Sequence, residues 1–447
     1  MAPPRYEAKE VDPAPLGKPL HFEFSGRTAR NRFLKGAMTE RLSSWDPKNL
    51  EARGVPSKNL AKVYRRWGEG EFGVILTGNT MIEYDHLEAA GNPIIPRDAP
   101  YEGERFEGFK EIATQAKKHG SLIIAQVSHP GRQVTDNIQP NPISASDVKL
   151  EGNIMGMTFA KPRPATEEDI KNVIEGFAHA AEYLEKAGYD GIQLHGAHGY
   201  LLAQFLAPST NHRTDKYGGS LENRARIITE IGQEVRRRTS PNFVLGIKLN
   251  SVEFQDKGFN TDEATILCKM LEDNKFDFVE LSGGTYENPA FSHKRESTKK
   301  REAFFLDFAE KIAPELSKTK TYVTGGFKSA AAMVDALNTV DGVGLARPVC
   351  LEPELPKQIL KKEVLSAIKQ LMDDNDFGQT NVAAGTQIRQ LGKDQQPIDL
   401  SDPKNLEAFG KDVGKWMQGL QEDDEGKKYG YVDLESVLAV PYGSAAP

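Results

Sequence analysis

Cysteine is scarce in this chain of 447 residues, which contains only Cys268 and Cys350. Two cysteines cannot form a framework of several disulfides, and they cannot supply the four thiolates of an all-cysteine zinc or iron–sulfur site. The scarcity therefore excludes a disulfide-rich secreted domain and indicates a reducing compartment.

Long apolar runs and an excess of positive charge are missing as well. No run reaches the roughly 18 residues that a membrane-spanning helix requires, and the formal net charge is −7, with a pI of about 5.8. The opening MAPPRYEAKEVDPAP is polar and proline-rich, without the apolar core of a signal peptide or the acid-poor composition of a transit peptide. We expect a cytoplasmic protein whose partners include neither nucleic acid nor a membrane.

Short apolar runs are what the chain does contain, and eight of them are nearly continuous rather than alternating. Runs of this kind are typical of parallel strands that are buried on both faces. The predicted strands are Phe33–Met38, Gly73–Thr77, Leu122–Gln126, Gly191–Leu194, Val244–Leu249, Phe278–Leu281, Thr321–Val323 and Gly342–Leu345.

Amphipathic patterns separate these runs, and several carry helix start and stop signals. Thr166 precedes three acidic residues, which predicts a helix N-terminus. Gly120 and Gly188 stand where a left-handed C-terminal cap is needed. The predicted helices are Ser57–Gly70, Phe106–His119, Glu167–Gly188, Ser220–Arg238, Thr261–Asn274, Ala303–Ala313, Ser329–Leu337 and Pro353–Asp373.

Eight strands that alternate with helices predict an α/β fold, a (β/α)8 TIM barrel, over residues 18–373. We expect a flexible N-terminal arm over residues 1–17 and a hairpin, turning at Ser25-Gly26, that caps one end of the barrel. A C-terminal helical extension over residues 374–447 is expected to pack on the barrel.

A doubly wound open sheet is the alternative fold, but no GxGxxG motif follows the first predicted strand. The loops over residues 127–165 and 283–301 are longer than ordinary connections. Both fall on the C-terminal face of the predicted barrel, where enzymes of this fold hold their active sites.

Two histidines and a tyrosine, His195, His198 and Tyr200, follow the fourth predicted strand within six residues. Imidazoles can donate hydrogen bonds to a carbonyl oxygen on which negative charge develops. A phenol, with a pKa of about 10, can protonate an enolate carbon. A zinc site is the rival interpretation, with His129, His212 or an acid as the third ligand, although the spacing is not that of HExxH.

Glycines follow the last two predicted strands. Gly325 and Gly326 come after the seventh strand, and Ala346-Arg347 follows the eighth. Loops at these positions of a barrel commonly hold a phosphate on backbone N–H groups, and Arg347 adds positive charge. The two loops predict a phosphorylated ligand. A non-flavin lyase or isomerase that acts on a phosphorylated substrate would have the same loops and is the alternative function.

Other strand ends carry residues that suit a flat, electron-accepting ligand. Gln126 ends the third strand and Lys248 the fifth. Pointing inward, the amide would bond the polar edge of a ring, and the ammonium would place positive charge beside a ligand that gains electrons. The small residues and the hydroxyl of Ala37-Met38-Thr39 suit a ring that lies flat across the barrel mouth.

The segment HGAHGYLLAQFLAPSTNHRTDKYGGSLENRARIITEI resembles the characteristic segment of the Old Yellow Enzyme family, FMN-dependent NADH:flavin oxidoreductases and ene-reductases built on a (β/α)8 barrel. NRFLKGAMTERL, LIIAQVSHPGRQ, LSGGTYENPAF, VTGGF and DGVGLARP resemble family motifs in the same order. The resemblance implies that the chain binds FMN non-covalently and takes hydride from NAD(P)H. By a ping-pong mechanism, it would then reduce activated alkenes, at the C=C bond of α,β-unsaturated carbonyl compounds.

The resemblance also implies a role for each candidate residue. His195 and His198 would bind the carbonyl oxygen of the substrate, and Tyr200 would donate a proton to its α-carbon. The residues implied at the FMN are Ala37, Met38 and Thr39 along the ring, Gly78 at its edge, Gln126 at the pyrimidine edge, Lys248 by N1 and O2, and Gly325, Gly326, Ala346 and Arg347 at the phosphate.

The chain departs from the family pattern at four positions. Ala37 stands where a proline is usual, and Lys248 where many members have an arginine, whose planar fork lysine lacks. Thr39 replaces the redox-tuning cysteine of some bacterial members, and Ser128 replaces a tryptophan of yeast members. The sequence leaves open the natural substrate, the choice between NADH and NADPH, and the oligomeric state, a homodimer included.

Overall fold

A closed barrel of eight parallel strands forms the centre of the computed structural model, which describes residues 3–152, 156–252, 261–283, 306 and 308–444. The strands follow one another around the barrel in chain order, and β12 pairs with β3 to close it. The strands are β3 (Phe33–Lys35), β4 (Val74–Met81), β5 (Leu122–Ser128), β8 (Gly191–Gly196), β9 (Val244–Val252), β10 (Phe278–Gly283), β11 (Lys320–Thr324) and β12 (Gly342–Leu345). The predicted (β/α)8 barrel is confirmed.

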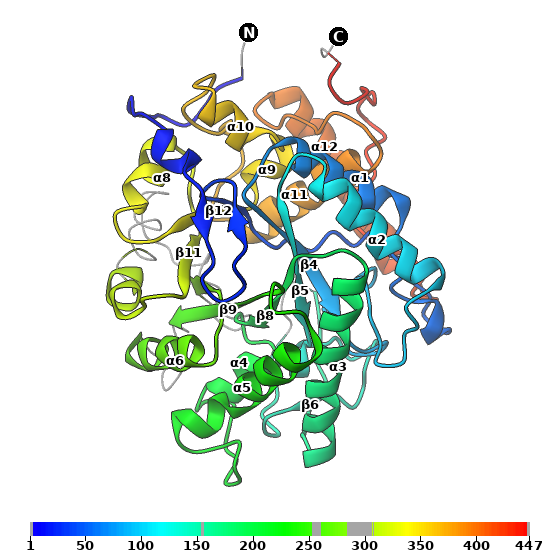
Figure 1. Ribbon diagram of the computed structural model, residues 1–447. Helices are drawn as coiled ribbons and strands as arrows, with labels where there is room; N and C mark the ends of the chain where they lie inside the picture. Colours follow the sequence, from blue (N-terminus) through cyan, green and yellow to red (C-terminus); the bar gives the residue numbers. More distant parts are fainter. Residues whose placement is uncertain (1–2, 153–155, 253–260, 284–305, 307, 445–447) are drawn as a thin grey trace.

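Helices surround the strands on the outside of the barrel (Figure 1). They are α1 (Lys58–Glu69), α2 (Gly103–Lys117), α3 (Glu167–Lys186), α4 (Leu201–Leu206), α5 (Leu221–Arg238), α6 (Thr261–Asp273), α8 (Ala330–Ala336), α9 (Pro348–Leu351), α10 (Leu355–Leu360), α11 (Phe377–Gly392) and α12 (Pro403–Gln421). The short elements are η1 (Ala14–Gly17), η2 (Leu50–Ala52), η3 (Gly131–Gln133), η4 (Ala313–Glu315), β6 (Ile143–Ser144) and β7 (Arg163–Pro164). The predicted helix start at Thr166 is confirmed, because its side chain and that of Asp169 form a capping box.

The predicted N-terminal hairpin is formed by β1 (Leu20–His21) and β2 (Thr28–Ala29), which pair antiparallel. Between them, the ring of Phe22 lies 5.9 Å from the ring of Phe278 in β10, within a cluster of buried side chains from inside the barrel. The hairpin therefore closes the N-terminal end of the barrel, so ligands must enter at the C-terminal ends of the strands.

The predicted helix Pro353–Asp373 is wrong. Helix α10 ends at Leu360, and Lys362 has a left-handed φ of 61°, which a right-handed helix cannot continue through. Farther along, the carbonyl of Ala367 accepts the N–H of Tyr6 at 3.0 Å. The N-terminal arm, which we expected to be flexible, is thus attached to the barrel within its described part.

Two other boundaries differ from prediction. β3 ends at Lys35 rather than Met38, because the chain leaves the sheet there and passes beside Gly78 of β4. The predicted helix Ala303–Ala313 lies partly outside the described residues, and its described residues 308–312 are helical. In the C-terminal extension, α11 packs against α1 (Figure 1).

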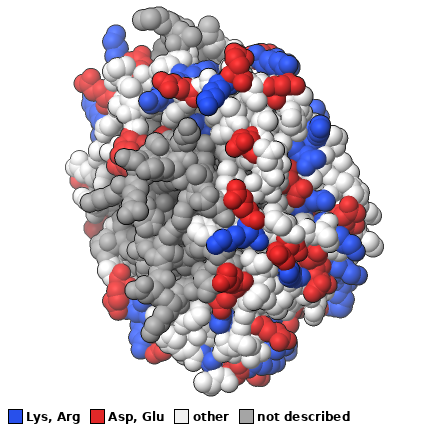
Figure 2. Space-filling model, turned by 90° about the vertical axis from the view of Figure 1, so that its left-hand side faces the viewer, with Lys and Arg blue, Asp and Glu red and all other residues white. Residues whose placement is uncertain are grey.

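The surface carries charged side chains of both signs. On the face shown in Figure 2, they are mixed without a continuous basic patch among the described residues. Within the described ranges, no helix is long and apolar enough to cross a membrane.

Candidate active site at the C-terminal ends of the strands

The three residues predicted to act together, His195, His198 and Tyr200, meet in the structure. His195 lies near the end of β8, and Tyr200 is the N-cap residue of α4. The ring centroid of His195 lies 4.6 Å from that of Tyr200 and 5.3 Å from that of His198, and both contacts are edge-on. His198 has a φ of 58°, a conformation that is uncommon for residues other than glycine. Its backbone N–H donates to Asn250 Oδ1 at 3.2 Å. The loop after β8 therefore brings two imidazoles and a phenol to one place.

Both imidazoles are held in the neutral form. Nδ1 of His195 accepts the N–H of Ala197 at 3.3 Å, so the proton of this imidazole is on Nε2. Burial holds the pKa of His195 well below its usual value, and the positive charge of Lys248 acts in the same direction. Burial and the charge of Lys248 lower the pKa of His198 to about 3. A neutral imidazole can still donate one hydrogen bond to a ligand oxygen.

The pKa of His198 predicts that its protonation weakens the fold in acid. Because the folded protein resists a proton that the unfolded chain accepts near pH 6.5, the free energy of unfolding falls as the pH drops from about 6.5 toward 3. Through His198, the wild type should lose up to about 2 kcal/mol of unfolding free energy between pH 7 and pH 5. His198→Gln cannot be protonated, so this variant should not show that part of the loss. Guanidinium unfolding of both proteins at the two pH values measures this, and an identical loss in both would contradict a neutral His198.

Ser282, near the end of β10, is a contact that the sequence did not reveal. Its Oγ lies 2.9 Å from Nε2 of His198, although the two residues are 84 positions apart in the chain. Gln133 Nε2 donates to the carbonyl of His198 at 3.1 Å. A ligand oxygen would therefore share the His198 imidazole with a serine hydroxyl that already orients it.

A chain of buried polar side chains crosses the barrel one layer deeper than His195. Gln193 precedes His195 by two residues, so both side chains lie on the same face of β8. Gln126 Nε2 donates to Gln193 Oε1 at 2.8 Å, and Gln193 Nε2 donates to Glu280 Oε2 at 2.7 Å. Glu280 Oε1 forms an ion pair of 3.1 Å with Lys248 Nζ. The structure thus joins the predicted Gln126 and Lys248 through Gln193 and Glu280, which the prediction missed.

Glycine is required at Gly78 because the space beside its Cα is filled. A Cβ there would lie 2.3 Å from the Met38 carbonyl oxygen and 2.3 Å from Glu40 Oε2. Glu40 Oε1 accepts the N–H of Gly78 at 2.9 Å and the hydroxyl proton of Tyr64. The structure therefore brings Met38 and Gly78 together, and it adds the buried carboxylate of Glu40 as their support.

Thr39 and Ala37 lie on either side of Met38 and face different neighbours. Thr39 Oγ1 donates to Glu88 Oε2 at 3.0 Å and accepts from Asn79 Nδ2 at 3.4 Å. Asn79 Oδ1 is buried without a hydrogen bond partner among the described residues. Ala37 packs on the apolar cluster inside the barrel. A flat ring with polar edges would find an apolar support and an available acceptor here.

The loop after β11 has the backbone that close approach to a phosphate requires. Gly325 and Gly326 have φ values of 152° and 80°, in the region that favours glycine. Thr324 Oγ1, at the end of β11, is buried without a hydrogen bond partner among the described residues. An anion at this loop would satisfy that hydroxyl.

Ala346 and Arg347 follow β12, which pairs with β11 and so places their loop beside Gly325 and Gly326. Arg347 Nη1 donates to Thr380 Oγ1 of α11 at 2.5 Å. The predicted phosphate loops therefore lie together, and the C-terminal extension holds the arginine.

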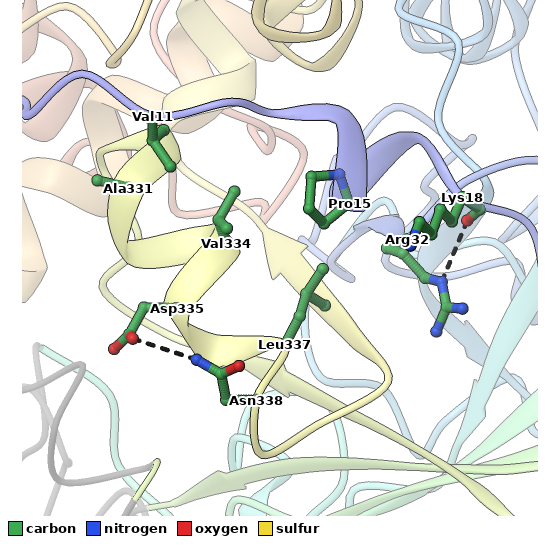
Figure 3. Close-up of a pocket in the computed structure, with 9 residues that line it drawn as sticks. All are labelled: Val11, Pro15, Lys18, Arg32, Ala331, Val334, Asp335, Leu337 and Asn338. Atoms are coloured by element: carbon green, nitrogen blue, oxygen red, sulfur yellow. Dashed lines mark hydrogen bonds between the residues drawn. The ribbon is translucent and has the colours of Figure 1, made fainter.

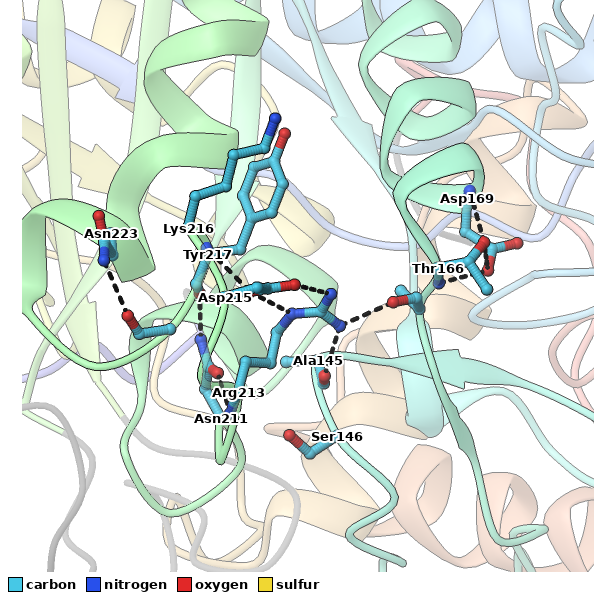
Figure 4. A network of polar contacts seen from close by, with 12 residues as sticks. Ala145, Ser146, Thr166, Asp169, Asn211, Arg213, Asp215, Lys216, Tyr217 and Asn223 are labelled. Carbon is cyan, nitrogen blue, oxygen red and sulfur yellow. Dashed lines mark hydrogen bonds and ion pairs between the residues drawn. The ribbon is translucent and has the colours of Figure 1, made fainter.

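The polar loop between α4 and α5 has a structural role. Arg213 donates to the carbonyls of Ala145 and Ala165 at 3.0 and 2.7 Å, and it forms an ion pair of 2.5 Å with Asp215 (Figure 4). The N–H of His212 donates to Ser146 Oγ at 2.9 Å. These contacts attach the loop to the segments around β6 and β7, so its polar residues are explained without a ligand.

The zinc alternative at His195 and His198 finds no support. In the part of the chain that the structure describes, the His, Cys, Asp and Glu side chains close enough to share a metal ion are Glu83, His86 and His129. This group includes neither of the two histidines in question.

A separate hollow of about 450 Å³ lies between η1 and α8 (Figure 3). Pro15, Arg32 and Val334 are among the residues that line it. Because Arg32 directly precedes β3, the hollow opens at the N-terminal end of the barrel and is not part of the candidate site.

Known proteins resemble this chain over most of its length. Residues 15–365 match the NADH:flavin oxidoreductase / NADH oxidase family. The chain is 54% identical over 410 residues to the NADH-dependent flavin oxidoreductase nadA of Aspergillus parasiticus, an alignment that covers 91% of this chain and 92% of that protein. It is 36% identical over 363 residues to the NADH-dependent flavin oxidoreductase iccE of Talaromyces variabilis, covering 75% and 84% of the two chains.

A solved structure supports the fold. The Old Yellow Enzyme homologue from Zymomonas mobilis superimposes with a TM-score of 0.65 and 22% identity. The match covers 82% of this chain and 96% of that one.

Proposed function

Because this chain belongs to the NADH:flavin oxidoreductase / NADH oxidase family and is an NADH-dependent flavin oxidoreductase, we propose that it reduces the C=C bond of α,β-unsaturated carbonyl compounds. The observation that carries the proposal is the meeting of His195, His198 and Tyr200 at the C-terminal ends of the strands. Two neutral hydrogen bond donors beside a phenol suit a carbonyl oxygen and a neighbouring carbon that must be protonated.

FMN, held without a covalent bond, is the cofactor that we propose. Its ring would fit the apolar support at Ala37, the glycine at position 78 and the polar chain from Gln126 to Lys248. Its phosphate would fit the Thr324 hydroxyl, which has no hydrogen bond partner among the described residues. Its proposed binding residues are Ala37, Met38, Thr39, Gly78, Gln126, Lys248, Gly325, Gly326, Ala346 and Arg347. When bound, FMN supplies hydride transfer from NADH to the alkene.

The protein's own groups would act on the carbonyl end of the substrate. Nε2–H of His195 donates to the carbonyl oxygen, while His198 approaches the same oxygen in the orientation that Ser282 gives it. Both donors withdraw electron density from the C=C bond, so the β-carbon becomes electrophilic. The hydroxyl of Tyr200 then delivers its proton to the α-carbon.

Cofactor content tests the proposal first. Purified protein should be yellow, absorb at about 450 nm as flavins do, release FMN on denaturation, and bleach anaerobically with NADH. A maleimide or a cyclic enone should restore the colour and yield the saturated carbonyl product. A colourless protein that FMN does not reconstitute would contradict the cofactor. Bleaching by NADH without any alkene reduction would leave the family activity but contradict the substrate class.

A non-flavin lyase or isomerase is not favoured. The phosphate-type loops alone would allow it, but the relatives named above are flavin oxidoreductases, and the match covers the whole barrel.

A further inference from the structure

Glu280 is a fully buried carboxylate at the end of the polar chain beneath the candidate active site. The register of the barrel places it beside Lys248 of β9, which in turn lies beside His195 of β8. Glu280 Oε1 has no hydrogen bond partner among the described residues, so the ammonium of Lys248, 3.1 Å away, is the group that offsets its charge most directly. Because a buried charge is costly unless it is paired, each of the two side chains depends on the other.

A second buried lysine, Lys35 of β3, has its ammonium directed elsewhere. Its Nζ donates to the carbonyl of Leu76 at 2.9 Å and lies 3.9 Å from the centroid of the Trp67 ring. These two partners hold the charge of Lys35, and Lys248 remains the direct counter-ion of Glu280.

The charge of Lys248 reaches the candidate active site. Burial and this charge together lower the pKa of His198 to about 3, and the same two causes lower the pKa of His195. A group that offsets the charge of Lys248 therefore changes the electrostatic potential at the place where a ligand would bind. Glu280 is such a group.

The same carboxylate fixes the direction of the amides in the polar chain. An ionised carboxylate only accepts hydrogen bonds, so Gln193 must turn its Nε2 toward Glu280 Oε2, 2.7 Å away. Gln193 Oε1 then faces Gln126 and accepts its Nε2–H at 2.8 Å. Glu280 thus orients the amide of Gln126, which is proposed to meet the pyrimidine edge of the flavin ring.

We propose that Glu280 is a positioning residue, which acts through Lys248 to lower the reduction potential of the bound flavin. A flavin gains electrons when it accepts a hydride, so a positive charge beside the ring favours the reduced form. A carboxylate that offsets this charge favours the oxidised form. The inference rests on the proposed position of the flavin beside Lys248, and it is independent of the proposed substrate class.

Glu280→Gln tests the proposal through the midpoint potential of the holoenzyme, measured by anaerobic spectroscopic titration against a reference dye. Glutamine keeps the size of the side chain and can still accept from Gln193, but it no longer offsets Lys248. We expect the reduced flavin to gain at least about tenfold in stability over the oxidised flavin, a potential about 30 mV more positive for a two-electron couple. An unchanged or a more negative potential would overturn the proposal.

Asp277→Asn is the matched control. Asp277 directly precedes β10, is fully buried, and forms an ion pair of 2.9 Å with Arg236. The substitution therefore removes the same charge at the N-terminal end of the same strand, away from the candidate site. Its midpoint potential should equal that of the wild type. An equal shift in Asp277→Asn and Glu280→Gln would show that the potential reports a loosened barrel and would overturn the role of Glu280.

A second pair of proteins repeats the comparison without leaving a buried lysine unpaired. Lys248→Met retains the carboxylate alone and should have the most negative potential of the series, whereas Lys248→Met with Glu280→Gln should have a more positive one. Equal potentials in these two variants would overturn the role of Glu280 and leave the cofactor proposal intact. A wild type that binds no FMN would overturn both.

Discussion

Tyr200→Phe is expected to slow the reduction of an enone by about 10²- to 10⁴-fold, the usual contribution of a positioned general acid. The phenyl ring remains as packing against His195, whose centroid is 4.6 Å away, so only the proton source is lost. Reduction of the flavin by NADH requires no proton from this group and should keep its wild-type rate. Anaerobic stopped-flow measurements separate the two half-reactions.

Tyr189→Phe is the matched control for this substitution. Tyr189 precedes β8 and is buried, and its hydroxyl has no hydrogen bond partner among the described residues, so the same atom is removed at the other end of the strand that carries His195. Both half-reactions of this variant should proceed at wild-type rates. If Tyr200→Phe slowed both half-reactions equally, its role would be structural rather than that of a proton donor.

Lys248→Met is expected to destabilise the fold by about 3–5 kcal/mol, because it leaves the buried carboxylate of Glu280 without its counter-ion. Glu280 is fully buried, and its ion pair with Lys248 measures 3.1 Å. Guanidinium unfolding should show the loss as a lower midpoint. The same substitution should weaken FMN binding, since it removes the positive charge proposed to lie beside the ring.

The double variant Lys248→Met with Glu280→Gln isolates the charge effect. Glutamine still accepts the Gln193 hydrogen bond that Glu280 accepts at 2.7 Å, but it leaves no unpaired charge. We expect the double variant to be more stable than Lys248→Met alone. If both unfold at the same midpoint, the ion pair does not hold the polar chain together.

The fold was predictable because the apolar strand runs are local features of the sequence, and the phosphate loops follow from strand order. The helix predicted over Pro353–Asp373 failed since its C-terminal half bonds instead to the N-terminal arm through Ala367. Tertiary partners of this kind are invisible in a local pattern.

The site was predicted in its outline but not in its supports. His195, His198 and Tyr200 lie within six residues of sequence, so their meeting was foreseeable. Ser282 and Glu280 come from a distant strand, and only barrel closure brings them to His198 and Lys248. A single polar residue within an apolar strand, as in FVEL or GIQL, was the available signal for the buried polar chain.

Rapid anaerobic mixing of the NADH-reduced enzyme with a cyclic enone shows whether the reduced flavin passes its hydride to an activated alkene. The flavin absorbance should return at a rate that rises with enone concentration, and one saturated ketone should form for each flavin reoxidised. A reduced flavin that stays bleached in the presence of enones, yet reoxidises promptly with oxygen, would contradict the claim that the His195–His198–Tyr200 site reduces activated alkenes.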